Sequence, residues 1–251
     1  FISGGAPLSK EIGEFFYYAG VLILEGYGLT ETSPVIAVNR CENFKFGTVG
    51  QVIPGVEVKI ADDGEILTRG PHIMKGYHKN SEETKKVIDS EGWFYTGDIG
   101  FLDENGFLTI TDRKKNIIIT SLGKNIAPQP IENTLALSRY ISQVILIGDK
   151  RKYISALIIP DYPNLEDYAK IYNISYKNKN ELIYHNKVNE LYESEINRLL
   201  SHYSGFEQIK KFKLLDGEFT IENGELTPTL KIKRKYIEQK YAEMIEQLYA
   251  E

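Results

Sequence analysis

The sequence has almost no cysteine and no long apolar run. Cys41 is the only cysteine among 251 residues, so no disulfide can form within the chain, which fits a reducing compartment. The longest apolar runs, Val21–Leu24 and Val144–Ile147, are too short to span a bilayer as helices. No secretory signal is evident, but the chain starts at Phe1 rather than Met. We therefore expect the true N-terminus to be absent and targeting to be unreadable.

A dominant charge of one sign is lacking as well. The 30 Lys and Arg residues are interspersed with 35 Asp and Glu residues, and the net charge is -5. No broad basic field favours nucleic acid as a partner. Common catalytic patterns are missing too, because the four histidines lack metal-ligand spacing and there is no Gly-x-Ser-x-Gly or P-loop sequence. With 42% hydrophobic residues, the chain can build a core in one large or two ordinary domains.

The first part of the chain has the pattern of an α/β sheet. Residues Lys10–Ala19 predict a helix whose Ile12, Phe15 and Phe16 point inward. Val21–Leu24 predicts a buried parallel strand. The loop Glu25–Thr32 then follows the carboxyl end of that strand, which is where ligands bind in open α/β sheets.

From Gly47 to Asp112 the pattern changes to short strands and tight turns, typical of a small β-subdomain. Asn80 predicts the cap of a helix over 82–88, and Asn105-Gly106 predicts a hairpin turn. A polar segment begins at Arg113, where we place a domain boundary.

The remainder predicts a compact α+β domain. Ile117–Ile119 predicts a strand, Pro130 opens a helix, and Ile141–Ile147 pairs with Tyr153–Ile159. Apolar residues at helical spacing predict a helix up to Tyr203 and one last helix from Tyr236 to Leu248.

The segment Glu25–Thr32 is rich in groups that can hold a nucleotide. Its glycines allow a close approach of the backbone, the Thr30 hydroxyl can donate to a phosphate, and the Glu31 carboxylate can hold Mg²⁺. The alternative is a tight turn with a polar cap. It is not a dinucleotide-binding fingerprint, because Glu31 occupies the place of the third glycine.

Three further residues each have two interpretations. Asp98 accepts the ribose hydroxyls of a nucleotide, or it binds its own backbone in a turn. Arg113 contacts ribose or phosphate oxygens, or it lies in a solvated linker. Lys231 offers a point charge to a phosphoryl group, or it is an exposed lysine at a helix start.

The order of these motifs along the chain is more specific than any one of them. They are Ser3–Leu8, Gly26–Glu31, Gly64–Gly70, Tyr95–Asp98, Asp112–Lys115, Gly123–Pro128, Pro130–Glu132 and the terminal Lys231. This series resembles the adenylate-forming superfamily, which includes acyl-CoA synthetases, luciferases and the adenylation domains of peptide synthetases. The resemblance extends over essentially the whole chain.

The resemblance implies an α/β plus α+β fold with two domains. Residues 1–112 would be the C-terminal portion of a large adenylation domain, with a piece of its sheet and the small β-subdomain. Residues 113–251 would be a compact, mobile α+β lid domain. Lys115 would be the hinge between them.

The resemblance also implies roles for individual residues. Thr30 would bind the α-phosphate of ATP, Glu31 would hold Mg²⁺, and Lys231 would reach the α-phosphate during adenylation. The other residues expected to bind ATP or CoA are Gly4, Gly5 and Ala6 at the adenine pocket, Tyr27 against adenine, Asp98 and Arg113 at the ribose, and Gly123 at the pantetheine channel.

The implied reaction joins a fatty acid to CoA through an acyl-adenylate, with release of pyrophosphate and AMP. Leu230 stands where most short-chain and aryl members have glycine, and Ile126–Glu132 and the helical stretch Pro163–Tyr203 also resemble the long-chain branch. The acyl pocket lies mostly upstream, so the acyl chain length is not readable.

One family motif, the Ser/Thr/Gly-rich phosphate loop, is missing because it lies upstream. We therefore expect the fragment alone to be inactive. Two alternatives are an enzyme that transfers the acyl group to a carrier protein and a non-catalytic binding fragment. The resemblance favours a cytoplasmic location. A lipid substrate is compatible with peripheral membrane contact, and the oligomeric state is not readable.

Overall fold

The structure is a computed structural model that describes residues 1–250, and the chain divides into two compact units. The first unit is Phe1–Lys115, and the second begins at Asn116. The sequence predicts a boundary at Arg113, inside the polar segment that ends at Asn116. The interpretation of the second unit as a mobile lid stays a prediction.

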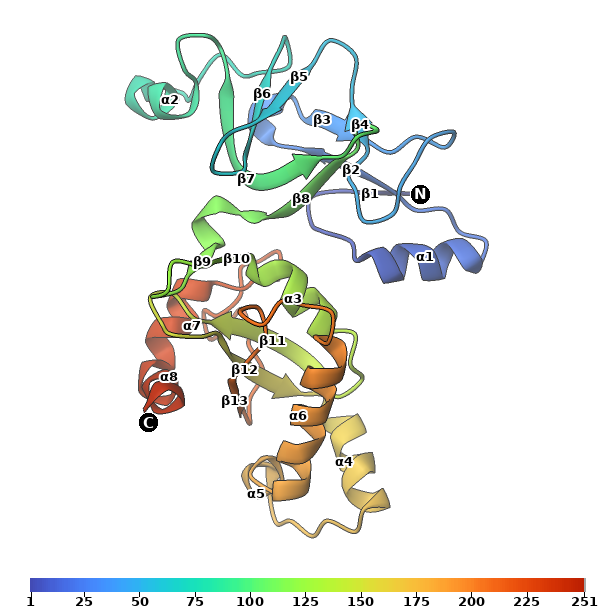
Figure 1. The fold of residues 1–251 in the computed structure, drawn as a ribbon, viewed down its shortest axis with the longest axis vertical. Helices are drawn as coiled ribbons and strands as arrows, with labels where there is room; N and C mark the ends of the chain where they lie inside the picture. Colours follow the sequence, from blue (N-terminus) through green and yellow to red (C-terminus); the bar gives the residue numbers. More distant parts are fainter. Residues whose placement is uncertain (251) are drawn as a thin grey trace. The chain divides into compact units, whose positions relative to one another are not determined.

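The first unit contains two four-stranded sheets, β1-β2-β3-β4 and β5-β6-β7-β8 (Figure 1). The strands β1 and β2 pair in parallel, and the other neighbours in these sheets pair antiparallel. The elements are β1 (Ile2–Ser3), α1 (Lys10–Tyr18), β2 (Leu24–Gly28), the 3₁₀ turn η1 (Thr30–Thr32), β3 (Val35–Val38), β4 (Gln51–Val52), β5 (Glu57–Ile60), β6 (Glu65–Arg69), α2 (Ser81–Val87), β7 (Phe94–Leu102) and β8 (Leu108–Arg113).

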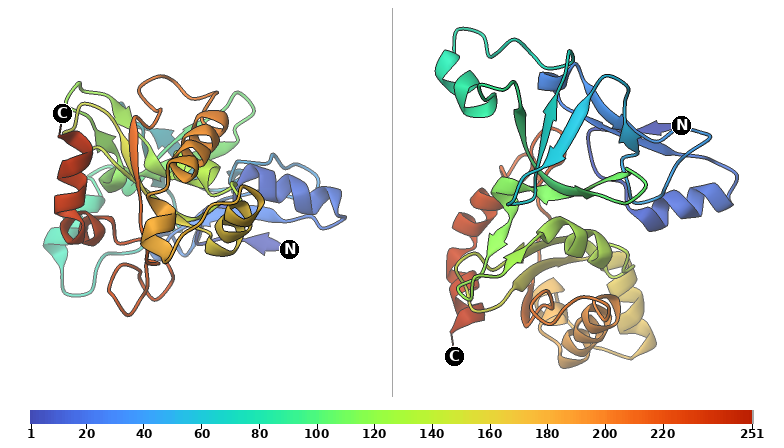
Figure 2. Two further views of the ribbon diagram at one scale, coloured as in Figure 1. Left: turned by 90° about the horizontal axis from the view of Figure 1, so that it is seen from below. Right: turned by 45° about the horizontal axis from the view of Figure 1, so that its top comes forward.

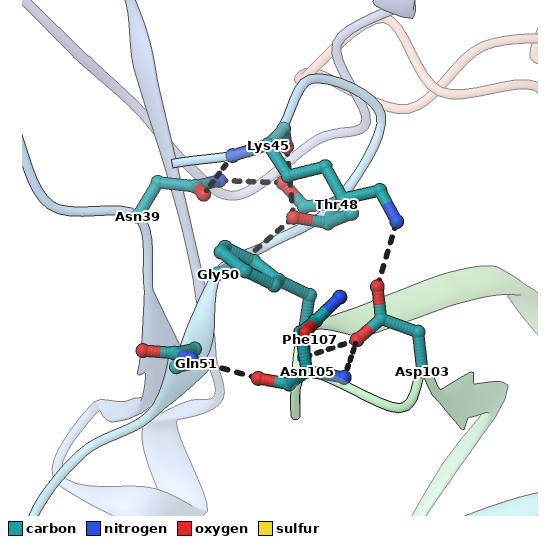
Figure 3. Close-up of polar contacts among 8 residues, drawn as sticks. All are labelled: Asn39, Lys45, Thr48, Gly50, Gln51, Asp103, Asn105 and Phe107. Atoms are coloured by element: carbon teal, nitrogen blue, oxygen red, sulfur yellow. Dashed lines mark hydrogen bonds and ion pairs between the residues drawn. The ribbon is translucent and has the colours of Figure 1, made fainter. Parts of the chain in front are cut away.

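The loop between β3 and β4 connects the first sheet to the hairpin turn between β7 and β8 (Figure 3). The Asn39 side chain accepts a hydrogen bond from the Lys45 backbone N–H at 3.0 Å, which folds the loop. The Lys45 ammonium then reaches Asp103 Oδ2 in the hairpin turn at 2.7 Å. Gln51 Nε2 donates to the Asn105 carbonyl at 2.8 Å. These contacts hold the second sheet against the first.

Two predictions for the first part of the chain are wrong in detail. Helix α1 forms as predicted, but Ile12, Phe15 and Phe16 are 42%, 68% and 38% exposed rather than buried. No described segment covers this face, and Gly13 is the buried residue of the helix. The parallel strand starts at Leu24, at the end of the predicted strand, and continues through residues predicted to be a loop.

The second unit contains a three-stranded sheet, β11-β12-β13, and a small hairpin, β9-β10. Strands β11 and β12 pair, as the sequence predicts, and their pairing is antiparallel, whereas β13 pairs in parallel with β12. The elements are the 3₁₀ turn η2 (Lys114–Asn116, which starts in the first unit), β9 (Ile118–Ile119), β10 (Asn125–Ile126), α3 (Pro128–Leu135), β11 (Ile141–Ile147), β12 (Ser155–Pro160), α4 (Tyr162–Ile171), α5 (Lys179–Ile183), α6 (Asn186–Leu199), β13 (Lys211–Leu214), α7 (Arg234–Lys240) and α8 (Ala242–Tyr249).

Both faces of the β11-β12-β13 sheet are buried. Side chains alternate across a strand, so Val144 and Leu146 point to one face and Ile145 and Ile147 to the other. The first face packs against α3, α4 and α6, and the second against α7 and α8. Figures 1 and 2 show these two groups of helices on opposite sides of the sheet. The second unit is therefore a three-layer α/β/α sandwich, with a core on each side of the sheet.

The C-terminal helix differs from its prediction. It is interrupted at Tyr241, which has φ -103° and ψ 21° and separates α7 from α8. The Tyr241 ring packs edge-on against Phe219, and its hydroxyl donates to the buried Glu225 carboxylate at 3.3 Å. The helix after the β9-β10 hairpin starts at Pro128 rather than at Pro130. Among residues 1–250, no helix has the length and apolar character needed to cross a membrane.

Candidate active site

A buried carboxylate, Asp98, lies at the centre of the predicted site in the first unit. Asp98 in β7 is directly opposite Arg113 in β8, and Arg113 Nε is 2.9 Å from Asp98 Oδ1. The Tyr27 hydroxyl, from β2, donates to Asp98 Oδ2 at 2.6 Å. Asp98 is only 4% exposed, and each of its oxygens has a partner. The two sheets thus bring Tyr27 to a pair of residues that lies about 70 positions further along the chain.

Burial dominates the protonation behaviour of this group. It raises the pKa of the Asp98 carboxyl above its ordinary value, although the hydrogen bond from Tyr27 and the charge of Arg113 both act to lower it. Burial and the neighbouring Asp98 also raise the pKa of the Tyr27 hydroxyl far above its ordinary value. Tyr27 is therefore a permanent hydrogen-bond donor at physiological pH.

A cavity of about 700 Å³ opens beside this group, entirely within the first unit. Its volume falls within the roughly 300–1,000 Å³ range of small-molecule sites. The lining residues come from both sheets and from α2, and they are Gly5, Gly28, Leu29, Thr30, Glu31, Glu65, Tyr77, Lys86, Val87, Phe94, Tyr95, Thr96, Gly97, Arg113 and Lys114. Polar groups of both charges therefore face one ligand-sized space.

The turn after β2 places Thr30 and Glu31 at the cavity. Gly28 is required there, because a Cβ on it would lie 1.6 Å from the Pro34 carbonyl oxygen. The Thr32 hydroxyl closes the turn by donating to Pro34 O at 2.6 Å, and it accepts from the Leu29 N–H at 2.9 Å. The exposed Thr30 hydroxyl is thus held on a folded turn at the cavity wall.

Glu31 is the carboxylate best suited to hold Mg²⁺ here. It lines the cavity, it is partly exposed, and its Oε1 accepts a hydrogen bond from the Tyr77 hydroxyl at 3.0 Å. Within residues 1–250, no group of three or more His, Cys, Asp or Glu side chains could hold a metal ion. Mg²⁺ is usually bound by one or two carboxylates together with substrate phosphates. The residues present therefore fit a Mg²⁺–nucleotide complex rather than a site made of protein ligands alone.

The remaining predicted residues have different relations to this cavity. Gly5, with φ +82°, lines it, whereas its neighbours Gly4 and Ala6 do not. Tyr27 and Asp98 are not among the lining residues. Arg113 does line the cavity, and it pairs with Asp98, which in turn bonds Tyr27.

Gly123 and Lys231 belong to the second unit, and the hinge candidate Lys115 is the last residue of the first. Gly123 forms the turn of the β9-β10 hairpin with φ +73°. Its N–H donates to the Thr120 carbonyl at 2.9 Å. Lys231 is exposed on the segment that precedes α7.

A second carboxylate at the cavity, Glu65, was not predicted from the sequence. Glu65 is 5% exposed and accepts the Gly97 N–H at 2.9 Å with Oε1 and the Lys114 ammonium at 2.7 Å with Oε2. Lys114 also bonds Asp63 Oδ2 at 2.6 Å, and these two hydrogen bonds raise the pKa of Lys114 above its ordinary value. Glu65 therefore supports the residues next to both Asp98 and Arg113. Its position in β6, in a motif already noted for its order, was the only signal available.

The chain matches two known family models. The AMP-binding enzyme family matches residues 1–78, and the AMP-binding enzyme C-terminal domain matches residues 115–251. The chain is 41% identical over 249 residues to a protein named Long-chain-fatty-acid--CoA ligase FadD15 from Mycobacterium tuberculosis, covering 99% of this chain and 41% of that protein. The chain thus spans about two fifths of the length of such curated relatives.

Other relatives are similar over the same region. The chain is 35% identical over 271 residues to Long-chain-fatty-acid--[acyl-carrier-protein] ligase AEE15 of Arabidopsis thaliana, covering 99% of this chain and 35% of that protein. Its fold matches the adenylation domain of a carboxylate reductase from Mycobacterium chelonae, with a TM-score of 0.80 at 26% identity, covering 100% of this chain and 38% of that one. These matches confirm the predicted fold class.

Proposed function

The chain belongs to the AMP-binding enzyme family, and from this membership we propose that it is the C-terminal part of an ATP-dependent acyl-CoA synthetase for long-chain fatty acids. The observation that carries the proposal is the cavity at which Thr30, Glu31 and Arg113 meet. The 41% identity to a protein named as a long-chain-fatty-acid--CoA ligase supports the class of acid. The substrates would be a fatty acid, ATP and CoA, and Mg²⁺ would accompany ATP.

The first half-reaction would make the acyl group transferable. A carboxylate is a poor acyl donor, because its charge repels nucleophiles and its oxygen leaves poorly. Attack of the fatty-acid carboxylate on the α-phosphate of ATP forms an acyl-adenylate and releases pyrophosphate. Thr30 would donate to the α-phosphate and Lys231 would offset the charge that builds on its oxygens. Mg²⁺, held by Glu31, would supply further charge neutralisation.

The same cavity would hold the nucleoside. Asp98 would bind the ribose hydroxyls and Arg113, its ion-pair partner, would contact the ribose as well. Tyr27, whose hydroxyl bonds Asp98, would pack on adenine. In the second half-reaction the CoA thiol attacks the acyl carbon, and AMP leaves with the bonding electrons. Gly123, on its exposed hairpin turn, would line the channel for the pantetheine arm, and Lys115 would be the hinge that exchanges the two half-reactions.

ATP–pyrophosphate exchange by the full-length parent, with fatty acids of graded chain length, tests this proposal. Exchange should be greatest with long chains, and Lys231→Ala should lower it about 100- to 1,000-fold, as loss of one charge-stabilising donor does in other enzymes. Lys235→Ala, at another exposed lysine four residues away, is the matched control and should leave exchange unchanged. If none of the acids tested supports exchange, the proposal is overturned. If only amino or aryl acids support it, the long-chain assignment is overturned.

A carrier protein is the alternative acyl acceptor. The specific observation in its favour is the 35% identity to a protein named as a long-chain-fatty-acid--[acyl-carrier-protein] ligase. Thioester formation by the full-length parent with CoA, compared with that on a phosphopantetheinylated carrier protein, separates the two. We expect faster turnover with CoA. Product on the carrier alone would replace CoA as the acceptor and retain the adenylation step.

A further inference from the structure

The loop that carries Lys231 is short and closed on itself. Leu226 and Ile232 form an antiparallel bridge, which defines the lysine loop as residues 226–232. Within it, the Thr227 N–H donates to the Lys231 carbonyl at 2.8 Å, and the Lys231 N–H donates to the Thr227 hydroxyl at 3.0 Å. The backbone of Lys231 therefore cannot move independently of the base of the loop.

The C-terminal side of this base is held by an arginine whose side chain is mostly buried. The basic cluster consists of Lys231, Lys233, Arg234 and Lys235, and among these only Arg234 is not exposed, with a side chain 17% accessible. Arg234 Nη2 is 2.7 Å from Glu132 Oε1 in α3, and Nη1 donates to the Leu146 carbonyl in β11. The sheet, α3 and the start of α7 meet at this one guanidinium.

Glu132 completes a closed ring of contacts with the same strand residue. Its side chain is 8% accessible, and Oε1 also accepts the Leu146 N–H at 2.7 Å. Leu146 thus donates to the carboxylate and accepts from the guanidinium, so the pair has a fixed orientation as well as a fixed distance. An arginine fork supplies this two-point geometry, and a lysine does not.

The N-terminal side of the base is held by a second buried carboxylate. Glu225 is 1% exposed, and it accepts the Thr220 N–H at 2.9 Å and the Lys240 ammonium at 2.7 Å. The Lys233 N–H donates to the Glu225 carbonyl at 2.8 Å, across the base of the loop. The loop therefore projects from a base that is held on both sides, by Glu225 and by the Glu132–Arg234 pair.

A buried ion pair is a costly way to gain stability, because desolvation of two charges offsets most of their attraction. Its distinctive effect is to fix geometry. Arg234 follows Lys231 by three residues. Ile232, which closes the lysine loop by its bridge to Leu226, lies between the two. Displacement of a catalytic group by about 1 Å can cost about 100-fold in rate.

We propose that Glu132 and Arg234 are positioning residues for Lys231, and that their ion pair sets the placement of its ammonium in the adenylation half-reaction. The inference rests on the proposed function. Neither residue needs to touch the substrate, since both act through the backbone of the lysine loop. Their loss should therefore reproduce the loss of Lys231 in kind, and not merely destabilise the second unit.

The test separates the two half-reactions in the full-length parent. Arg234→Lys keeps the charge but loses the fork, and Glu132→Gln keeps the shape and the acceptor for Leu146. Both should lower ATP–pyrophosphate exchange by about 10- to 100-fold in kcat with little change in the KM for ATP. Both should still form acyl-CoA from supplied acyl-adenylate and CoA at the unaltered rate, because Lys231 acts only in adenylation. Arg198→Lys is the control, because the Arg198 side chain is 62% accessible although it also pairs with a glutamate, Glu195, and this change should alter neither rate.

Each other outcome is informative. If the rates of both half-reactions fall and the melting temperature falls as well, the pair is structural and the inference is wrong. If exchange is unchanged in Arg234→Lys and Glu132→Gln while Lys231→Ala abolishes it, the inference fails and the proposed function stands. If no acid supports ATP–pyrophosphate exchange by the unsubstituted parent, the proposed function itself fails.

Discussion

At the scale of single residues, Leu230 has a backbone conformation that does not suit its side chain. Its φ is +59°, in the left-handed region, immediately before Lys231. This conformation costs a leucine about 1–2 kcal/mol relative to the right-handed one. The side chain is 69% exposed, so packing offsets little of that cost. The position where other branches of the family have glycine is thus one where glycine is conformationally favoured.

Substitution at position 230 should reverse the usual ranking of alanine and glycine. Leu230→Gly removes the steric cost, whereas Leu230→Ala keeps it, so the glycine variant should be more stable by about 1 kcal/mol. Urea unfolding of the 251-residue chain, followed by circular dichroism, measures the difference. Leu137, partly exposed and not among the residues with positive φ, is the matched control, and there alanine should be the more stable. Alanine equal to or better than glycine at 230 would refute the strain.

Asp98 should make stability depend on pH. Its folded-state pKa is raised by burial, so the folded state takes up a proton more readily than the unfolded chain. The contribution to stability is present below the unfolded pKa and is lost as pH rises through the folded one. Asp98→Asn should therefore gain stability relative to the unsubstituted chain as pH rises from acidic to neutral, despite the lost pairing with Arg113. Urea unfolding over a pH series measures this difference. A constant or opposite difference would contradict it, and Asp62→Asn, at an exposed position in the turn between β5 and β6, is the control.

Some residues of the site could be predicted from the sequence and others could not. Thr30, Glu31 and Arg113 all line the cavity. They could be predicted because glycine-rich turns and strand ends are recognisable from the local sequence. Glu65 and Tyr77 line it too, but they come from a β-strand and a loop where a polar residue reads as solvent-facing. Their direction depends on tertiary contacts with Lys114 and Glu31, which no spacing rule reports.

At the scale of elements, periodicity predicted the elements better than their partners. The strands β11 and β12 formed as predicted, because a continuous apolar run with turn residues between has few alternatives. Helix α1 also formed, but its apolar face is exposed. Periodicity indicates which face of a helix is apolar, but it does not indicate whether another segment packs against that face. The last helix is interrupted because the contacts of Tyr241 with Phe219 and Glu225 outweigh continuity of the helix.

Two glycines distinguish backbone strain from steric exclusion in the connection between the sheets of the first unit. Gly50 has φ +88°, and its carbonyl accepts the Leu108 N–H at 2.8 Å. A Cβ at this position would lie 2.0 Å from the Val38 backbone carbon. Gly106, in the β7-β8 turn, has φ +74° and nothing within 4 Å of the same point. Figure 3 shows Gly50 beside Thr48, whose hydroxyl accepts the Gly50 N–H at 3.2 Å.

Alanine at these two positions should therefore have unequal effects. Gly106→Ala should cost about 1–2 kcal/mol of unfolding free energy, from strain alone. Gly50→Ala should cost more, because the backbone must move and the bond to Leu108 is disturbed. Denaturant unfolding gives the free energies, and hydrogen exchange at the Leu108 amide should accelerate only in Gly50→Ala. Equal costs with unchanged exchange would show that the loop accommodates the added carbon.

At the scale of the whole molecule, the two units differ in the size of their cores. The second unit has a large apolar cluster on each face of its sheet, and both clusters consist of its own residues. The described part of the first unit has one small cluster, in which only Ala37, Ile66 and Leu108 are buried, and a helix whose aromatic side chains are exposed. Stability depends mainly on the apolar area removed from water, so independent folding should belong to the second unit.

A polypeptide of residues 116–251 should therefore fold alone, and residues 1–115 should not. We expect the first to give dispersed NMR spectra and one cooperative thermal transition, and the second to give broad signals and a gradual transition. Leu157→Ala serves as a check on the core, because Leu157 is fully buried and its truncation should lower the unfolding free energy by about 2–5 kcal/mol. Cooperative unfolding of 1–115 by itself would mean that its small cluster and hydrogen-bond network suffice, because the sheets would then need no further covering.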